Sequence, residues 1–129
     1  TTPLGRALAA LGQDLCQPPT VQGWEGGRIW ITTSTLVGRS NLAVAMLSGS
    51  EPFGDRLNPA AVAKKHGHPS ADTGSQFLVD LFLQGDLDAG VRERILKSDE
   101  RPPKSGDDPA PRLRQMAHAI VTLPEFQLA

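Results

Sequence analysis

The stretch DPAPRLRQMAHAIV, residues 108–121, decides the fold class. Its apolar side chains recur every three or four residues, which places them on one face of an α-helix. Asp108 followed by Pro109 is a typical helix start, because proline fits the first turn of a helix. The stretch therefore predicts an amphipathic helix that needs an apolar partner. Its apolar face comprises Leu113, Met116, Ala117, Ile120 and Val121.

The rest of the chain offers partners of the same kind. A first helix is expected to start at Thr2-Pro3 and to carry a stripe of leucines. Two further helices are expected from Thr33–Thr35 to about Leu47 and from Asn58-Pro59 to about Lys65. Two more are expected around Phe77–Phe82 and around Leu87–Ile95, the latter with Glu93 and Lys97 as an exposed ion pair. Pro18-Pro19 is expected to end the first of them. Only Arg28–Thr32 resembles a strand, and it is too short to found a sheet without a partner. The prediction is an all-α, irregular bundle of about five to six helices.

Size and charge limit the classes of protein. The 129 residues predict one helical domain, 1–129, and a net charge of −1 gives no basic surface for nucleic acid. The longest uninterrupted apolar run, Leu42–Leu47, is far shorter than the ~20 residues of a membrane span. We therefore expect neither a nucleic-acid partner nor a membrane span.

Charge is unevenly distributed along the chain. Only five of the 27 charged residues fall within the first 50 positions, which favours the interpretation that this part is the more buried one. Residues 86–114 carry 14 charges and are expected at the surface. Within them, residues 99–109 lack periodicity and contain three prolines, so a flexible linker or loop is predicted.

The most specific stretch is LGQDLCQPPTVQGWEGGRIWITTSTLVGRSN, residues 11–41. Together with the closing LPEFQ, residues 123–127, it resembles the signature of a bacterial family, domain of unknown function 1800. The residues that carry the resemblance are Gly12, Gln13, Pro18, Pro19, Val21, Gly23, Trp24, Gly26, Gly27, Trp30, Thr35, Leu36 and Arg39, with Glu125 and Phe126 near the end. Cys16 and Leu123 depart from the family pattern.

The resemblance implies a context for the chain and no particular activity. Family members are several hundred residues long, mainly helical and commonly exported from the bacterial cytoplasm. The chain would then be their C-terminal portion, with a periplasmic or extracellular location. Its partner would be the rest of the full-length chain. We expect a helical structural or interaction module.

The loop between the first two helices allows two interpretations. Its prolines fix φ angles, and its glycines permit positive φ, so a long ordered loop is expected. In the first, Trp24 and Trp30 pack into the core, and replacing either by alanine costs about 3–5 kcal/mol. In the second, they form an exposed platform for a glycan or peptide, flanked by Glu25 and Arg28.

Catalytic and metal chemistry find little support. His66-Gly67-His68 with Asp72 matches no standard zinc spacing, so a solvated turn is expected rather than a metal site. We expect no cofactor. Cys16 is predicted to be a small buried side chain, and His118 to lie at the surface. No residue is assigned a catalytic role, and a third hypothesis makes the chain part of a larger hydrolase or redox enzyme completed upstream.

Arg39 gives the sharpest expectation. On a helical wheel its direction lies among Ala43, Met46 and Leu47, so the guanidinium points into or along an apolar face. A buried guanidinium needs partners for its N–H groups. Arg39 is therefore predicted to be more than half buried and to clamp the Pro18–Trp30 loop or Glu125 to the second helix. The alternative is an anion-binding role at an open cleft.

Overall fold

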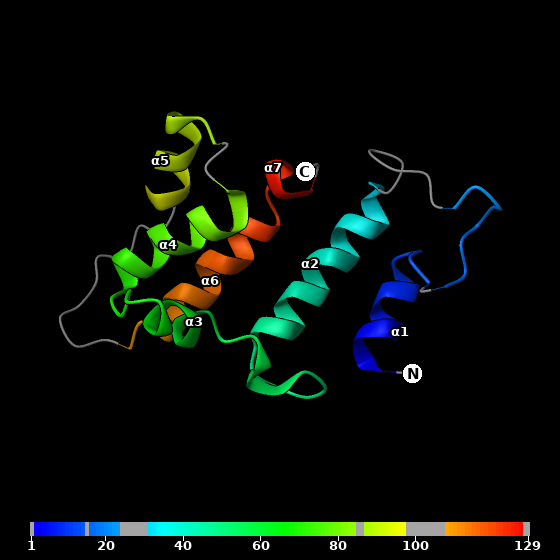
Figure 1. Ribbon diagram of the computed structural model, residues 1–129, viewed down its shortest axis with the longest axis horizontal. Helices are drawn as coiled ribbons and strands as arrows, with labels where there is room; N and C mark the ends of the chain where they lie inside the picture. Colours follow the sequence, from blue (N-terminus) through cyan, green and yellow to red (C-terminus); the bar gives the residue numbers. More distant parts are fainter. Residues whose placement is uncertain (1, 15, 24–30, 85–86, 98–107, 128–129) are drawn as a thin grey trace.

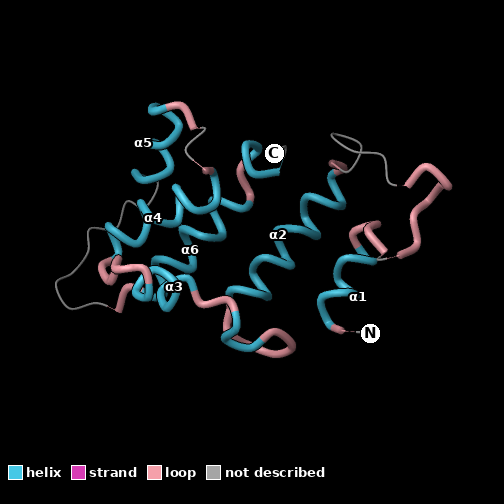
Figure 2. The backbone as a smooth tube through the Cα atoms, in the orientation of Figure 1, coloured by secondary structure: helices cyan, strands magenta, loops and turns pink. Residues whose placement is uncertain are grey.

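A computed structural model describes residues 2–14, 16–23, 31–84, 87–97 and 108–127. These residues form seven α-helices and one short 3₁₀ helix, and no strand occurs among them (Figures 1 and 2). The order is α1 (Pro3–Ala10), α2 (Thr33–Leu47), η2 (Gly54–Arg56), α3 (Pro59–Lys65), α4 (Ala71–Leu83), α5 (Ala89–Lys97), α6 (Ala110–Val121) and α7 (Pro124–Gln127). The all-α prediction is confirmed, although α7 was not expected and raises the number above six.

The helices begin where the sequence places capping residues. Thr2 Oγ1 accepts a hydrogen bond from Gly5 N at 3.3 Å, and Asn58 Oδ1 accepts from Ala60 N at 3.1 Å. Such side chains satisfy backbone N–H groups that have no partner within the first turn. The local caps therefore explain why these starts could be predicted.

The first helix ends earlier than predicted. It stops at Ala10 and not at Pro18-Pro19, because Gly12 adopts a φ of +82°. Gly12 N donates to Ala9 O at 2.9 Å and Gln13 N donates to Leu8 O at 2.9 Å, which together form a Schellman motif. The glycine, rather than the prolines, terminates the helix.

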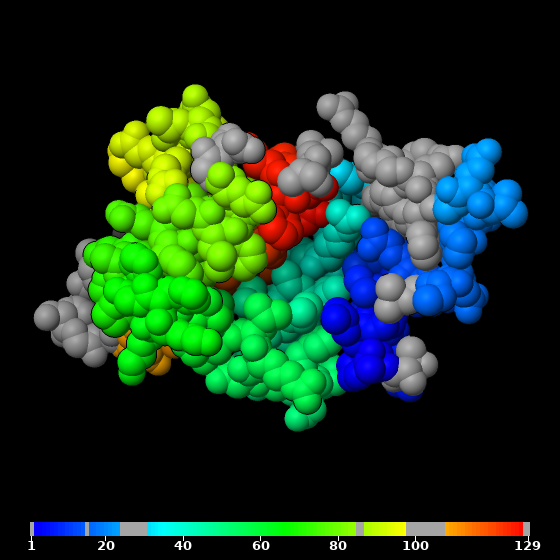
Figure 3. Space-filling model, viewed as in Figure 1, coloured from blue at the N-terminus to red at the C-terminus, as the bar shows by residue number. Residues whose placement is uncertain are grey.

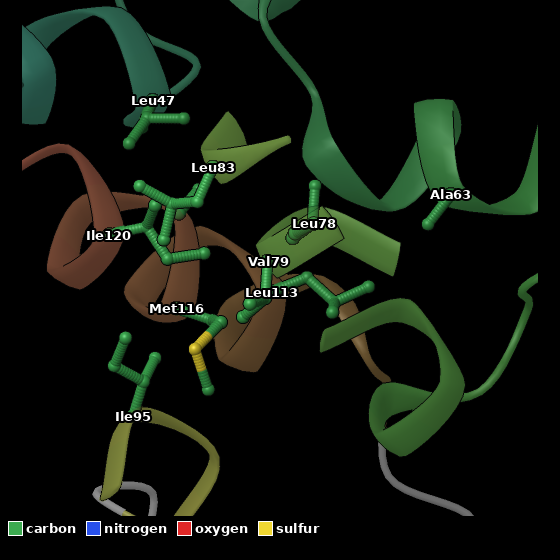
Figure 4. Close-up of a cluster of buried hydrophobic side chains, with 10 residues drawn as sticks. Leu47, Ala63, Leu78, Val79, Leu83, Ile95, Leu113, Met116 and Ile120 are labelled. Carbon is green, nitrogen blue, oxygen red and sulfur yellow. The ribbon is translucent and has the colours of Figure 1, made fainter. Parts of the chain in front are cut away.

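The core lies where α4 crosses α6, with α3, α5 and α7 packed around this pair (Figure 4). Leu78, Leu113 and Ile120 are fully buried there. Gly74 allows close approach: a Cβ at this position would lie 2.9 Å from both methyl groups of Leu113. The predicted apolar face of residues 113–121 is confirmed, and it packs against α4, the helix expected around Phe77–Phe82.

Ion pairs surround this core at the surface. Asp72 pairs with Arg112 at 2.9 Å, Asp55 with Arg114 at 3.1 Å, Glu93 with Lys97 at 2.7 Å, and Asp80 with Arg92. The hydrogen bond from Arg92 holds the pKa of Asp80 below its ordinary value. These ion pairs form a charged rim around the bundle, and Arg92, Glu93, Lys97, Arg112 and Arg114 contribute to it from the stretch 86–114 that was expected at the surface.

The charge-poor first 50 residues are not the buried part, and that interpretation was wrong. Among the described residues of this segment, only Gly5, Leu11 and Leu47 are buried. Figure 1 shows α1 at the edge of the molecule, on the side of α2 that faces away from α3, α4 and α5. The physical reason is that α1 and α2 form an outer layer, in which the scarcity of charge leaves apolar side chains exposed.

Some predicted features lie outside the described residues. Of the strand-like stretch, residues 28–30 lie outside, and Ile31 and Thr32 are not in a strand. Of the expected linker 99–109, only Asp108 and Pro109 are described, and the Asp108 carboxylate accepts a hydrogen bond from Ala110 N at 3.0 Å. No helix in the described parts of the chain has the length and apolar character needed to cross a bilayer.

Candidate functional site

An apolar pocket of about 340 Å³ lies between the outer layer and the bundle. One wall comes from α1 and α2, through Leu8, Leu11, Leu42 and Met46. The opposite wall comes from α4, α6 and α7. In the space-filling view, the surface is recessed over α2, between α1 in blue and the C-terminal residues in red (Figure 3). This pocket is the candidate site, because ligand sites are concave, mostly apolar and supplied with a few polar groups.

The wall on the bundle side is held by aromatic packing. Phe82 of α4 and Phe126 of α7 meet edge to face, with ring centroids 5.9 Å apart at 77°. Such pairs prefer this geometry because the positive edge of one ring faces the negative face of the other. Both rings line the pocket. The unpredicted helix α7 therefore closes part of the site.

Arg39 supplies the charge of the pocket. It is more than half buried, and Nη1 donates to Gln127 Oε1 at 2.7 Å. Gln127 Nε2 in turn donates to Val121 O at 2.5 Å. The predicted clamp to the C-terminal motif exists, but its partner is Gln127 rather than Glu125, which is exposed. Most of the Pro18–Trp30 loop, the other predicted partner, lies outside the described residues.

Gln13 adds an amide to the same pocket. Its position follows from the Schellman motif at the end of α1, which turns the chain directly after Gly12. Residues from both stretches that carry the family resemblance thus meet here: Gln13 and Arg39 from the first, Phe126 and Gln127 from the second.

Most of the other predicted binding residues cannot be placed relative to this site, because the structure does not describe them. Trp24, Glu25, Gly26, Gly27, Arg28 and Trp30 lie outside the described residues. Pro18 and Pro19 are exposed, so this part of the loop does not pack on the helices as expected. Gly23 has a φ of +97° and donates from its N to Thr20 O at 3.0 Å, which explains a glycine at that turn.

Cys16 is a further correction. It was predicted to be buried, but the side chain is exposed and the residue has a φ of +66°. A left-handed backbone conformation is typical of a turn. Cys16 therefore belongs to the exposed turn after α1 and not to the core.

The turn of the two neighbouring histidines is exposed at His66 and Gly67, as expected, and both imidazole rings also pack on an aromatic ring. The rings of His66 and His68 stack on Phe77, with centroids 5.3 Å and 4.9 Å away. Gly67, with a φ of +86°, makes the turn between them. Where the structure describes the chain, no three metal-ligating side chains come together. The arrangement explains these histidines as packing residues.

One polar contact was missed by the sequence. Ser40 Oγ lies 3.1 Å from His118 Nε2, which joins α2 to α6 and makes His118 partly buried rather than a surface residue. A serine beside a histidine resembles a nucleophile and its base. However, Ser40 lies inside α2, where the backbone N–H groups bond along the helix and cannot form an oxyanion hole. The contact is structural.

The fold and the pocket define a class: an all-helical domain with a mostly apolar cavity, in which Arg39 is the charged residue among the described lining residues. The chain matches the family model "Protein of unknown function (DUF1800)" over residues 1–128, and it belongs to this family. Neither the comparison with curated proteins nor that with solved structures gave a match.

Proposed function

We propose that the chain is a helical interaction module whose α2 surface packs against another protein surface of low charge. The supporting observation is the exposure of Val37 and Val44, at 56% and 50%. They are seven residues apart, so they lie on one face of α2. Clustered apolar exposure is typical of interaction sites.

The occupant we propose is the remainder of a longer polypeptide of the same family. The low charge of residues 1–50 matches a partner that is itself apolar, since a charged partner would lose solvation there without gaining an ion pair. Export from the bacterial cytoplasm is part of the same proposal and depends on the family resemblance. Cell fractionation tests the location.

Thiol accessibility tests the interface. In a Cys16→Ser background, Val44→Cys should react quickly with a maleimide in the chain of residues 1–129. It should react at least about tenfold more slowly in the full product of the gene, because the partner surface excludes the reagent. Ala61→Cys, on the exposed side of α3, is the matched control and should react alike in both. Equal reactivity of Val44→Cys in both proteins, or a gene that encodes nothing further, would overturn the proposal.

A further inference from the structure

The pocket has mostly apolar walls and one charged side chain, that of Arg39, among the described residues that line it. Leucine, methionine, alanine, valine and phenylalanine side chains form most of its surface. Its volume of about 340 Å³ lies at the lower end of the ~300–1,000 Å³ that is typical of small-molecule sites. An apolar chain of moderate length would therefore gain from entering it.

Among the described residues that line the pocket, Arg39 is the charged one, and none of them is acidic. A guanidinium carries five N–H donors in a planar fork, and one of its nitrogens already donates to Gln127. The Gln13 amide also lines the pocket, close to the end of α1. The electrostatic complement of this charge is an anion, and a carboxylate matches the geometry of the fork.

We propose that the pocket binds a medium-chain aliphatic carboxylate. The alkyl chain lies between the α1–α2 wall and the wall of Phe82 and Phe126. The carboxylate accepts hydrogen bonds from Arg39, which Gln127 holds in position. Gln127 is thus a positioning residue, and the clamp and the anion-binding role both belong to Arg39.

This site is separate from the proposed protein interface. Leu42 and Met46 line the pocket, whereas Val37 and Val44 point to the opposite side of α2. A change on one side of the helix leaves the other side in place. The two proposals can therefore fail independently.

Calorimetric titration with decanoate tests the ligand class. Decan-1-ol and decyltrimethylammonium, with the same alkyl length, are the matched probes. The carboxylate should bind at least about tenfold more tightly than either, because a charge-assisted hydrogen bond is stronger than a neutral one. Equal binding of the three probes, or no binding of decanoate, would overturn the proposal.

Two variants locate the binding. Arg39→Gln should weaken decanoate by about tenfold or more and leave decan-1-ol unchanged, which a merely structural role would not do. Ala43→Phe should fill the pocket and abolish binding of both, while Ala61→Phe on exposed α3 should have no effect. If Ala43→Phe does not fold, Val121→Phe makes the same test from α6. Decanoate affinity retained in a folded pocket-filled variant would contradict the assignment.

Discussion

The α4–α6 contact and the α1–α2 side of the molecule are both apolar, yet only the first is closed to water. In the first, Leu78 and Val79 of α4 are almost completely buried. In the second, Val37 and Val44 are half exposed, and a pocket opens beside α2 where it borders the bundle. A low charge content therefore identifies an apolar surface without saying whether this chain itself covers that surface.

The largest effect should come from the closed region. Leu113→Ala removes a side chain that is 1% exposed and should lower the free energy of unfolding by about 2–5 kcal/mol, through lost burial and a new cavity. Leu36→Ala on α2, where the side chain is 40% exposed, should cost less than about 1 kcal/mol. Urea denaturation measures both. Equal losses would remove the distinction between the two regions.

Two glycines sharpen the comparison. Gly74→Ala places a Cβ 2.9 Å from both methyl groups of Leu113, which the core holds in place, so a loss of about 1–3 kcal/mol is expected. Gly38→Ala would meet Leu11 Cδ2 at 2.6 Å, but Leu11 borders the pocket and can move into it. Its cost should be smaller because Leu11 can move, whereas the gain of about 1 kcal/mol in helix propensity is common to both variants. Thermal melts of the two variants measure these losses of stability. A larger loss for Gly38→Ala would show that the outer layer is as tightly packed as the core.

The smallest effect concerns charge, which the rim of the bundle has and the α2 surface lacks. Arg92 lowers the pKa of Asp80 in the folded state. The pair therefore stabilises the fold above the unfolded-state pKa of the carboxyl, and this contribution is lost as the pH falls through the lower, folded-state value. Since the pair is exposed, Asp80→Asn should cost only about 0.2–1 kcal/mol at neutral pH.

The matching measurement is urea denaturation of the wild type and of Asp80→Asn at neutral pH and in acid that protonates the carboxyl. The difference between the two proteins should vanish in acid. A difference that persists unchanged would mean that Asp80 acts through packing instead of charge.

Local signals account for what the sequence could predict. Thr2-Pro3 and Asn58-Pro59 give helix starts within a few residues, and the periodicity of residues 113–121 gives the core face. The pairing of Arg39 with Gln127 joins residues 88 positions apart, and that of Ser40 with His118 joins residues 78 positions apart. Neither has a local signature, because both depend on how α2 lies across the bundle.

For the candidate site, too, single residues could be predicted from the sequence, whereas the pocket that they line could not. The sequence identified Arg39 as a buried cation and Gln13 and Phe126 as motif residues, whereas the binding surface it predicted at Trp24 and Trp30 lies outside the described residues. The pocket is lined by five helices, which are spread along the chain from α1 to α7, so no local sequence pattern can indicate it. The four-residue helix α7 was missed, because a single turn is too short for periodicity to appear.

The most direct test compares the same substitution in the middle of two helices. Val79→Asp puts a carboxylate into the closed core and should lower the free energy of unfolding by more than about 3 kcal/mol. Val44→Asp puts it on the α2 surface and should change that free energy by less than about 1 kcal/mol. Urea denaturation of both variants of residues 1–129 gives the answer. A loss for Val44→Asp as large as that for Val79→Asp would contradict the account, because the charge-poor first half would then be core after all.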